Sequence, residues 1–342
     1  MKLAQIFCAA TLVAAAASTV QAQAQAQAQT APQLKVVARI KGPDGGWDYA
    51  NFDPARRKVY ITRGATVMVI DVDSGKVNPH FSDGKRLHAA VPVPGTDVIV
   101  TTDSGDNTAK IISAADGHLI AAIPTPNDAD GAIYDAHSGL VLVVCGEAGA
   151  VVLIDPKTRK SVGMIEVGTP LEFAGVDGKG RAFVNEEARN AVAVLDLASR
   201  KLVATWPLPN CQRPTGLAYA EGQVISACGA GMADILDARS GKPIASLKIG
   251  GFPDAVIYDP HLRMAYVPSA LSGTMAVIPL SGLRKDTIIQ TVRTETGART
   301  GAVDPKTGRI YLPAAQYILP APAGQRPQPK PGTFEVLVVG AH

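Results

Sequence analysis

Seven residues, all but one of which have ionisable side chains, occupy the same position in successive units of a sequence repeat in this chain. Each lies four positions before an anchor segment such as Phe52-Asp53-Pro54 or Val303-Asp304-Pro305. The seven residues are Asp48, His88, Asp130, Glu172, Thr215, Asp254 and Arg299. The four carboxylates among them would repel one another around a shared space unless a cation, a nearby arginine or ordered water compensates. Because carboxylate oxygens are the ligands of Ca²⁺ and Mg²⁺, the four form a candidate site for a metal ion or a cationic ligand.

A solvated channel and a catalytic centre are the alternative roles for this ring of residues. In the simpler alternative, polar side chains line the channel and bind nothing. In the catalytic one, a metal ion polarises a carbonyl, His88 is the candidate base and Arg299 clamps an anion. Arg213, together with Arg299, would balance the acidic charge in either case.

A second group of polar residues falls at predicted strand ends on the same side of the fold. Its members are Arg63, Asp103, Glu147, Asn185, Glu186 and Tyr317. Ligand contacts concentrate in such loops, although soluble turns use the same residue types. Tyr317 also lies in a proline-rich segment, residues 313–331, which is too rich in proline for a strand and should be extended or partly disordered. That segment is either a lid over the channel, or a flexible loop or an arm that binds a partner.

An internal repeat of about 42 residues sets the spacing of these groups. One apolar strand residue marks each of the first six units, at Ile70, Ile112, Ile154, Leu195, Leu236 and Ile278, and a seventh copy lies around Val338 after the proline-rich segment. Every unit has short runs rich in Val, Ile, Tyr and Thr, and turns such as Asp-Pro or Ser-Gly-Lys separate these runs. Seven units of four strands predict an all-β fold, a seven-bladed β-propeller with four-stranded blades.

The segment at 34–40, LKVVARI, precedes the first unit and has no partners there. We expect it to supply the outermost strand of the last blade, beside the strand that ends at Val339. This pairing would close the ring and remove the free sheet edges that favour aggregation. The seven recurring residues would then meet at the mouth of the central channel.

The repeat resembles that of the YVTN-type bacterial propellers. The resemblance rests on Asp-Pro, four residues, then a Tyr-containing strand, as in FDPARRKVYIT (52–62) and YDPHLRMAYVP (258–268), and it covers essentially the whole chain after the leader. The name-giving Tyr-Val-Thr-Asn is absent, since the nearest version is Tyr60-Ile61-Thr62-Arg63. The resemblance implies a secreted or periplasmic propeller, and the wider superfamily includes lactone hydrolases as well as binding proteins.

The N-terminus is predicted to be a targeting segment. Lys2 is followed by an apolar stretch too short to span a membrane, and Val20-Gln21-Ala22 fits a cleavage site. We therefore expect a signal peptide at 1–22, a disordered leader at 23–33, and a single propeller domain at 34–342 in the periplasm or outside the cell. No other stretch reads as a membrane span, and 33 basic against 30 acidic residues argue against strong nucleic-acid binding.

Three cysteines follow the predicted leader. Cys211 and Cys228 are expected on one face of the propeller, where an oxidising compartment would allow a disulfide. Cys145 has no histidine beside it in the sequence and is interpreted as a buried free thiol.

Sequence motifs of several catalytic classes are absent, including Cys-x-x-Cys-His, His-Glu-x-x-His and Gly-x-Ser-x-Gly. The leading hypothesis is a monomeric periplasmic binding module that presents its charged channel mouth to a small ligand or a cell-envelope protein. The alternative is a metal-dependent hydrolase of the lactone-hydrolase type with its site in the channel.

Overall fold

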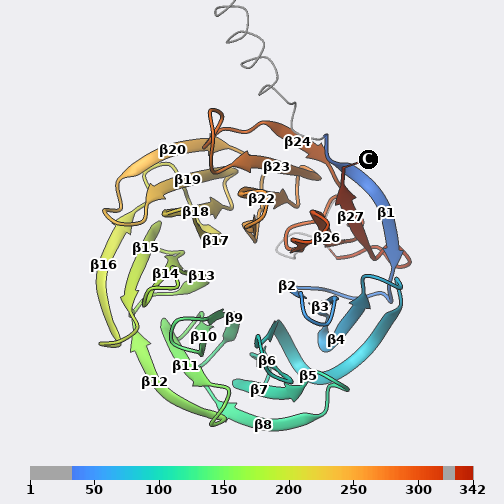
Figure 1. The fold of residues 1–342 in the computed structure, drawn as a ribbon, viewed down its shortest axis with the longest axis horizontal. Helices are drawn as coiled ribbons and strands as arrows, with labels where there is room; N and C mark the ends of the chain where they lie inside the picture. The colour runs from blue at the N-terminus through green and yellow to red at the C-terminus, as the bar shows by residue number, and fades with distance from the viewer. Residues whose placement is uncertain (1–32, 319–327, 342) are drawn as a thin grey trace, which may run out of the picture.

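The structure is a computed structural model that describes residues 33–318 and 328–341. These residues form a closed ring of seven four-stranded blades around a central channel (Figure 1). The predicted all-β, seven-bladed propeller is therefore confirmed. The signal peptide predicted at 1–22 and most of the predicted leader lie outside the described residues. No helix in the described part of the chain is long and apolar enough to cross a membrane.

Blades 1 and 2 share one long strand, β5, and so form a single seven-stranded sheet. In order from the channel outward, blade 1 contains β2 (Ala50–Asp53), β3 (Lys58–Thr62), β4 (Gly64–Asp71) and the first part of β5 (Val77–Pro92). Blade 2 contains the rest of β5, then β6 (Val98–Asp103), β7 (Thr108–Ser113) and β8 (Leu119–Pro124). The pairing of β5 passes from β4 to β6 at Leu87, which is opposite Gly64 on one side and Asp103 on the other.

Blades 3, 4 and 5 are separate sheets whose strands follow one another from the channel to the rim. Blade 3 consists of β9 (Ala129–Asp135), β10 (Leu140–Cys145), β11 (Ala150–Asp155) and β12 (Lys160–Glu166). Blade 4 consists of β13 (Leu171–Val176), β14 (Arg181–Glu186), β15 (Ala191–Asp196) and β16 (Lys201–Pro207). Blade 5 consists of β17 (Pro214–Ala220), β18 (Gln223–Cys228), β19 (Met232–Asp237) and β20 (Pro243–Lys248).

The last two blades complete the ring, and the N-terminal strand belongs to the final one. Blade 6 consists of β21 (Ile257–Asp259), β22 (Met264–Ser269), β23 (Thr274–Pro279) and β24 (Gln290–Arg293). Blade 7 consists of β25 (Ala302–Asp304), β26 (Arg309–Ala314), β27 (Glu335–Gly340) and β1 (Lys35–Lys41). β1 runs antiparallel to β27 at the rim, as predicted.

Strand position within a blade explains the apolar pattern of the sequence. The middle strand β11 is buried along almost its whole length because neighbouring blades cover both of its faces. The outer strand β16 alternates between exposed and half-buried residues because only one face meets the ring. The core therefore lies between blades, as where Leu142 of blade 3 and Val184 of blade 4 pack in one cluster.

The Asp-Pro anchors build the turn between the first two strands of a blade. Asp53 Oδ1 accepts hydrogen bonds from the backbone N–H groups of Ala55 and Arg56, at 2.9 and 3.0 Å. Pro54 fits between Asp53 and the first donor, Ala55, because its position needs no N–H donor. The turn ends on a residue with positive φ, 56° at Arg57 and 53° at Arg263.

The segment at 313–331 differs in part from the prediction. Pro313 lies within β26 and is paired with Val336, so the strand continues into the proline-rich segment. A proline is tolerated there because β25 pairs only with the first half of β26, through Tyr311. Beyond β26, Tyr317 forms an isolated bridge with Pro329. Residues 319–327 lie outside the described part of the chain.

Ring closure predicts that β1 stabilises the whole propeller. A chain that begins at residue 42 lacks β1 and exposes the edge of β27, so its melting temperature should fall by at least about 5 °C. A chain that begins at residue 32 keeps every strand and should melt like the chain that begins at residue 23. Equal melting temperatures for all three, measured by calorimetry, would contradict this role of β1.

A buried ion pair across the same seam gives a second prediction. Arg57 Nη1 of blade 1 lies 2.6 Å from Asp304 Oδ1 of blade 7, and the Asp304 side chain is 1% exposed. Arg57→Gln should cost about 2 kcal/mol of unfolding free energy, the usual value of a hydrogen bond to a charged group. The control is Arg263→Gln, because Arg263 has the same backbone conformation but pairs with Glu221 at the surface. That change should cost less than about 1 kcal/mol.

The effect of Arg57→Gln should also depend on pH. Burial raises the pKa of Asp304, but the hydrogen bonds from Arg57, Thr307 and the backbone of Lys306 together outweigh burial and leave that pKa below its ordinary value. A carboxylate with a lowered pKa stabilises the fold above its unfolded-state pKa, and this stabilisation is lost as the pH falls through the folded-state value. Urea titrations should therefore show the two proteins converging below about pH 4. A constant difference between pH 3 and pH 7 would argue against the ion pair.

Candidate functional site

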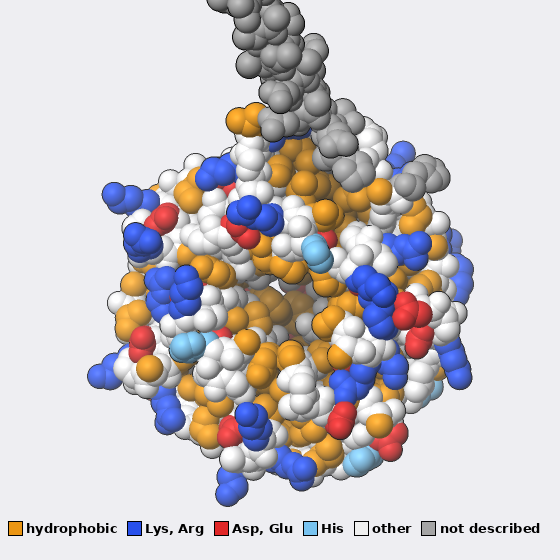
Figure 2. Space-filling model, viewed as in Figure 1, with side chains coloured by type: hydrophobic (Ala, Val, Ile, Leu, Met, Phe, Trp, Pro, Cys, Tyr) orange, Lys and Arg blue, Asp and Glu red, His pale blue; other side chains and the backbone are white. Residues whose placement is uncertain are grey.

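The ring residues predicted from the repeat stand at the start of the innermost strands, around one end of the channel. Figure 2 shows the molecule hollowed at the centre of the ring. We call this end the channel mouth and define it by the seven residues Asp48, His88, Asp130, Glu172, Thr215, Asp254 and Arg299. Asp130 and Glu172 lie within β9 and β13, whereas Asp48 and Arg299 come just before β2 and β25.

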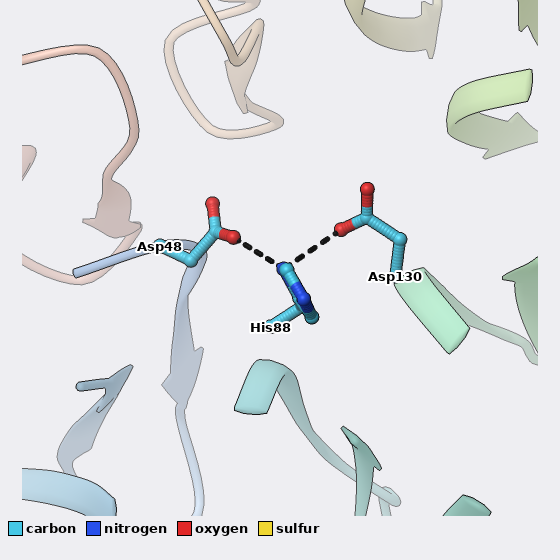
Figure 3. A group of neighbouring side chains, drawn as sticks. All are labelled: Asp48, His88 and Asp130. Atoms are coloured by element: carbon cyan, nitrogen blue, oxygen red, sulfur yellow. Dashed lines mark hydrogen bonds and ion pairs between the residues drawn. The ribbon is translucent and has the colours of Figure 1, made fainter. Parts of the chain in front are cut away.

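Three of these residues converge on a single point. His88 Nδ1 lies 2.6 Å from Asp48 Oδ2 and 3.2 Å from Asp130 Oδ1 (Figure 3). The other ring nitrogen, Nε2, lies 2.8 Å from Ser104 Oγ. His88 is almost fully buried, while the side chains of Asp48 and Asp130 are 20% and 19% exposed. Both nitrogens of His88 are thus engaged, and the two carboxylates remain open to the channel.

Hydrogen bonds from the preceding blade hold the backbone of these three residues. In each case a threonine hydroxyl donates to the carbonyl oxygen of the ring residue: Thr300 to Asp48, Thr62 to His88, and Thr102 to Asp130. Because each pair joins two blades, the positions of the side chains depend on closure of the ring.

The ionisable groups at this point shift one another's pKa values. Burial opposes the charge of His88, but the hydrogen bond with Asp48 and the charge of Asp130 outweigh burial and raise the pKa of His88. Burial, followed by the negative charge of Asp48, also raises the pKa of Asp130. His88 and Asp130 therefore each hold a proton to a higher pH than the free side chain would.

Arg299 is held by partners on both sides of the seam. Its Nε lies 2.9 Å from Asp254 Oδ2, and its Nη2 donates to the carbonyl oxygen of Trp47 at 2.7 Å. The guanidinium also lies over the Trp47 ring, 5.5 Å from its centroid, and 3.7 Å from Asp48 Oδ1. Through these contacts Arg299 holds Asp254 and the backbone beside Asp48 in place.

Glu172 differs from the other carboxylates. No hydrogen bond or ion pair joins its side chain to another described residue. Burial is the main cause that raises the pKa of Glu172 to about 9, and the charges of Asp130 and Asp254 add to it. Glu172 is thus protonated at neutral pH. The remaining member of the mouth, Thr215, donates its hydroxyl to the carbonyl oxygen of Pro253 at 2.8 Å.

The four carboxylates were predicted to bind one metal ion together, but the structure brings only two of them to one point. Asp48 and Asp130 come together with His88, and one ligand atom from each lies within 4.8 Å of the others. Asp254 is drawn to Arg299 instead, and Glu172 is not part of this group.

Several residues of the second predicted group have partners within the protein. Arg63 is buried, donates to the carbonyl oxygens of Pro43 and Gly46, and lies over the ring of Phe334. Its burial lowers its pKa to about 10. Asp103 accepts hydrogen bonds from the backbone N–H groups of Lys85 and Arg86.

The rest of the group is divided between the interior and the surface. Glu186 and Asn185 are buried, and Asn185 Nδ2 donates to the carbonyl oxygen of Thr215. Glu147 is exposed and accepts a hydrogen bond from Asn127. Tyr317 stacks on Trp47 with ring centroids 6.3 Å apart.

Arg213 lies beside the mouth on the loop before β17. Its Nε is 3.2 Å from Glu187 Oε1, and its guanidinium lies over the ring of Phe252. A surface cavity of about 430 Å³ adjoins it, lined by Pro170, Glu187, Ala188, Asn190, Gln212 and Arg213.

Sequence reasoning missed the residues that support the mouth. Ser104 and the three threonines are short hydroxyl side chains in strand ends and turns, where such residues are common. The available signal was position, since Thr62 and Thr102 both stand at or next to the end of the second strand of a blade. Separately, Cys211 and Cys228 form a disulfide with Cα atoms 5.4 Å apart, and Cys145 is a buried free thiol.

Comparison with known proteins gives the fold. No protein-family model matches the chain, and no curated protein matches it. The structure of the RRP9 WD40 repeats matches with a TM-score of 0.78 at 10% identity, covering 91% of this chain and 100% of that chain. The chain has a WD40-like β-propeller fold.

Two further structures agree. The structure of U3-55K matches with a TM-score of 0.75 at 10% identity, covering 91% of this chain and all of that chain. Hydrazine synthase of Kuenenia stuttgartiensis matches with a TM-score of 0.70 at 14% identity, covering 80% and 94%. At these identities the likeness concerns the fold alone.

The buried carboxyl of Glu172 gives a prediction with a defined pH dependence. A carboxyl whose pKa is raised by folding destabilises the native state as the pH rises from the unfolded-state value, about 4.3, toward the folded-state value. In metal-free buffer, Glu172→Gln should therefore raise the unfolding free energy at pH 8 by at least about 1 kcal/mol, the equivalent of one pKa unit. At pH 4 it should have little effect.

The charges that act on Glu172 come from Asp130, Asp254, Glu187 and Asp48. Glu166→Gln is the matched control, because Glu166 is exposed at the end of β12. Urea unfolding at the two pH values measures both variants. An equal response of Glu172→Gln at pH 4 and pH 8 would show that Glu172 is not held in its neutral form.

Proposed function

We propose that this chain is an exported β-propeller of the YVTN type that binds a small cationic ligand at its channel mouth. The observation that supports it most strongly is the position of Asp48, Asp130 and Asp254 around one opening, with the neutral carboxyl of Glu172 beside them. Of the basic groups of the mouth, Arg299 is bound to Asp254, and His88 lies between Asp48 and Asp130. A recess in which carboxylates predominate concentrates cations.

A small ligand fits this geometry better than a protein partner. The side chains of Asp48, Asp130 and Asp254 are only 19–21% exposed. The surface of a cell-envelope protein would meet the rim of the ring first, whereas a small cation can enter the channel. Export, a monomeric state and the absence of strong nucleic-acid binding belong to the same proposal, supported by the N-terminal sequence and the near-balanced charge.

A metal-dependent hydrolase of the lactone-hydrolase type is the second candidate, favoured by His88 between two carboxylates. A metal ion there would polarise an ester carbonyl. Because Nδ1 of His88 faces both carboxylates, the histidine would serve as a ligand in that enzyme and not as its base. Hydrolysis of dihydrocoumarin that a chelator abolishes would favour this candidate over the binding module.

Thermal shift measurements with spermidine test the binding function. A ligand that binds only the native state stabilises it by mass action, so spermidine should raise the melting temperature. Citrate should not. Replacing Asp48, Asp130 and Asp254 together by Asn should remove the rise, because the attracting charge is gone.

The control variant replaces three exposed carboxylates outside the mouth, Asp83, Asp116 and Glu166, by their amides. It should respond to spermidine like the parent protein, and circular dichroism should show both variants folded. If the two triple variants lose the response equally, spermidine binds through overall charge and the mouth is not the site.

A further inference from the structure

The group formed by Asp48, His88 and Asp130 has the composition of a metal site. Its donors are one imidazole nitrogen and two carboxylate oxygens, supplied by three successive blades (Figure 3). A nitrogen donor with carboxylates suits Zn²⁺, Co²⁺ or Mn²⁺. Ca²⁺, by contrast, takes six to eight oxygen ligands. The structure therefore shifts the expected ion from Ca²⁺ or Mg²⁺, which the carboxylates alone suggested, to a transition metal.

The three ligand atoms already lie near one another. Metal–ligand bonds of about 2.0–2.1 Å place neighbouring ligand atoms roughly 3.0–3.4 Å apart. His88 Nδ1 is 3.2 Å from Asp130 Oδ1 and 2.6 Å from Asp48 Oδ2, and all three ligand atoms lie within 4.8 Å of one another. Adjustment of the two carboxylate side chains would bring all three separations to the bonded spacing. Both carboxylates are partly exposed to the channel, which leaves a route for the ion and room for water ligands.

Ser104 supplies the outer support that a histidine ligand needs. A metal-binding histidine usually donates its other N–H to an acceptor that fixes the ring and its tautomer. His88 Nε2 lies 2.8 Å from Ser104 Oγ, which can accept that hydrogen bond. With the proton on Nε2, the lone pair of Nδ1 is directed at the two carboxylates.

The backbone of all three residues is fixed in the same way. Each of their carbonyl oxygens accepts a hydrogen bond from a threonine of the preceding blade. The donors are thus held in place before an ion arrives, which lowers the cost of binding.

We propose that Asp48 Oδ2, His88 Nδ1 and Asp130 Oδ1 bind one divalent transition-metal ion at the channel mouth, with Ser104 as the residue that positions His88. The proposal deepens the proposed function, since the metal would be a cation bound by the same mouth. It differs in requiring the nitrogen of His88, which a site for organic cations does not.

Metal titration of the exported protein, purified without a polyhistidine tag and stripped with chelator, tests the proposal. Isothermal titration with Zn²⁺ and with Co²⁺ should give one site, and the Co²⁺ complex should show the visible absorption of nitrogen and oxygen ligation. Ser104→Ala should weaken binding about 10–100-fold, as loss of an outer partner does. His88→Gln should weaken it more than Ser104→Ala.

A second histidine provides the matched control. His118 Nδ1 lies 2.7 Å from Asp116 Oδ1, but no second carboxylate of the described residues faces it. His118→Gln should leave the affinity unchanged. If His88→Gln does not fold, Asp130→Asn replaces it and should also lower the affinity. The proposal is overturned if the folded parent protein binds neither ion stoichiometrically, or if His118→Gln and His88→Gln weaken binding equally.

The same variants separate this proposal from the binding function. His88→Gln keeps every carboxylate of the mouth, so it should still be stabilised by spermidine while it loses the metal. A parent protein that responds to spermidine but binds no metal would refute the metal site and keep the binding function. A parent protein that binds metal but not spermidine would keep the metal site and refute the binding of organic cations at the mouth.

Discussion

The two-sided burial of the blades is the constraint on which this structure depends. Middle strands such as β11 are apolar on both faces, so a single blade would expose two apolar faces to water. Stacking covers both faces of a blade only if the blade has a neighbour on each side. A closed ring gives every blade two neighbours. The pairing of β1 with β27 and the Arg57–Asp304 contact therefore stabilise blades far from the seam.

The channel mouth uses this rigidity to keep charged groups in place. Carboxylates that repel one another would move apart on flexible loops. Here the innermost strands fix them, and hydroxyl groups such as Thr62 and Thr300 join each strand to the next blade. The unfavourable energy appears instead as raised pKa values, as at Glu172. A bound cation would relieve part of that energy.

The repeat made the fold and the mouth positions predictable, because the spacing of Ile70, Ile112 and Ile154 reports blades directly. The repeat spacing could not predict which side chains of the mouth are in contact. Asp254 bonds Arg299 and Asp130 faces His88 because of side-chain directions and distances across the channel, which one-dimensional spacing does not contain. The support from Ser104 depends on a turn of blade 2 that has no distinctive sequence.

The position of β1 sets the order in which the molecule can form. Among the described strands β1 is made first, and its partner β27 is made last. Arg39 and Glu335, whose side chains form an ion pair between these two strands, are 296 residues apart. Contacts between such distant residues form slowly, because the intervening chain must first become compact. Blades 1 to 6 can assemble in sequence as the chain is made, but blade 7 must wait for its last strand, so closing the seam should be the slow step of folding.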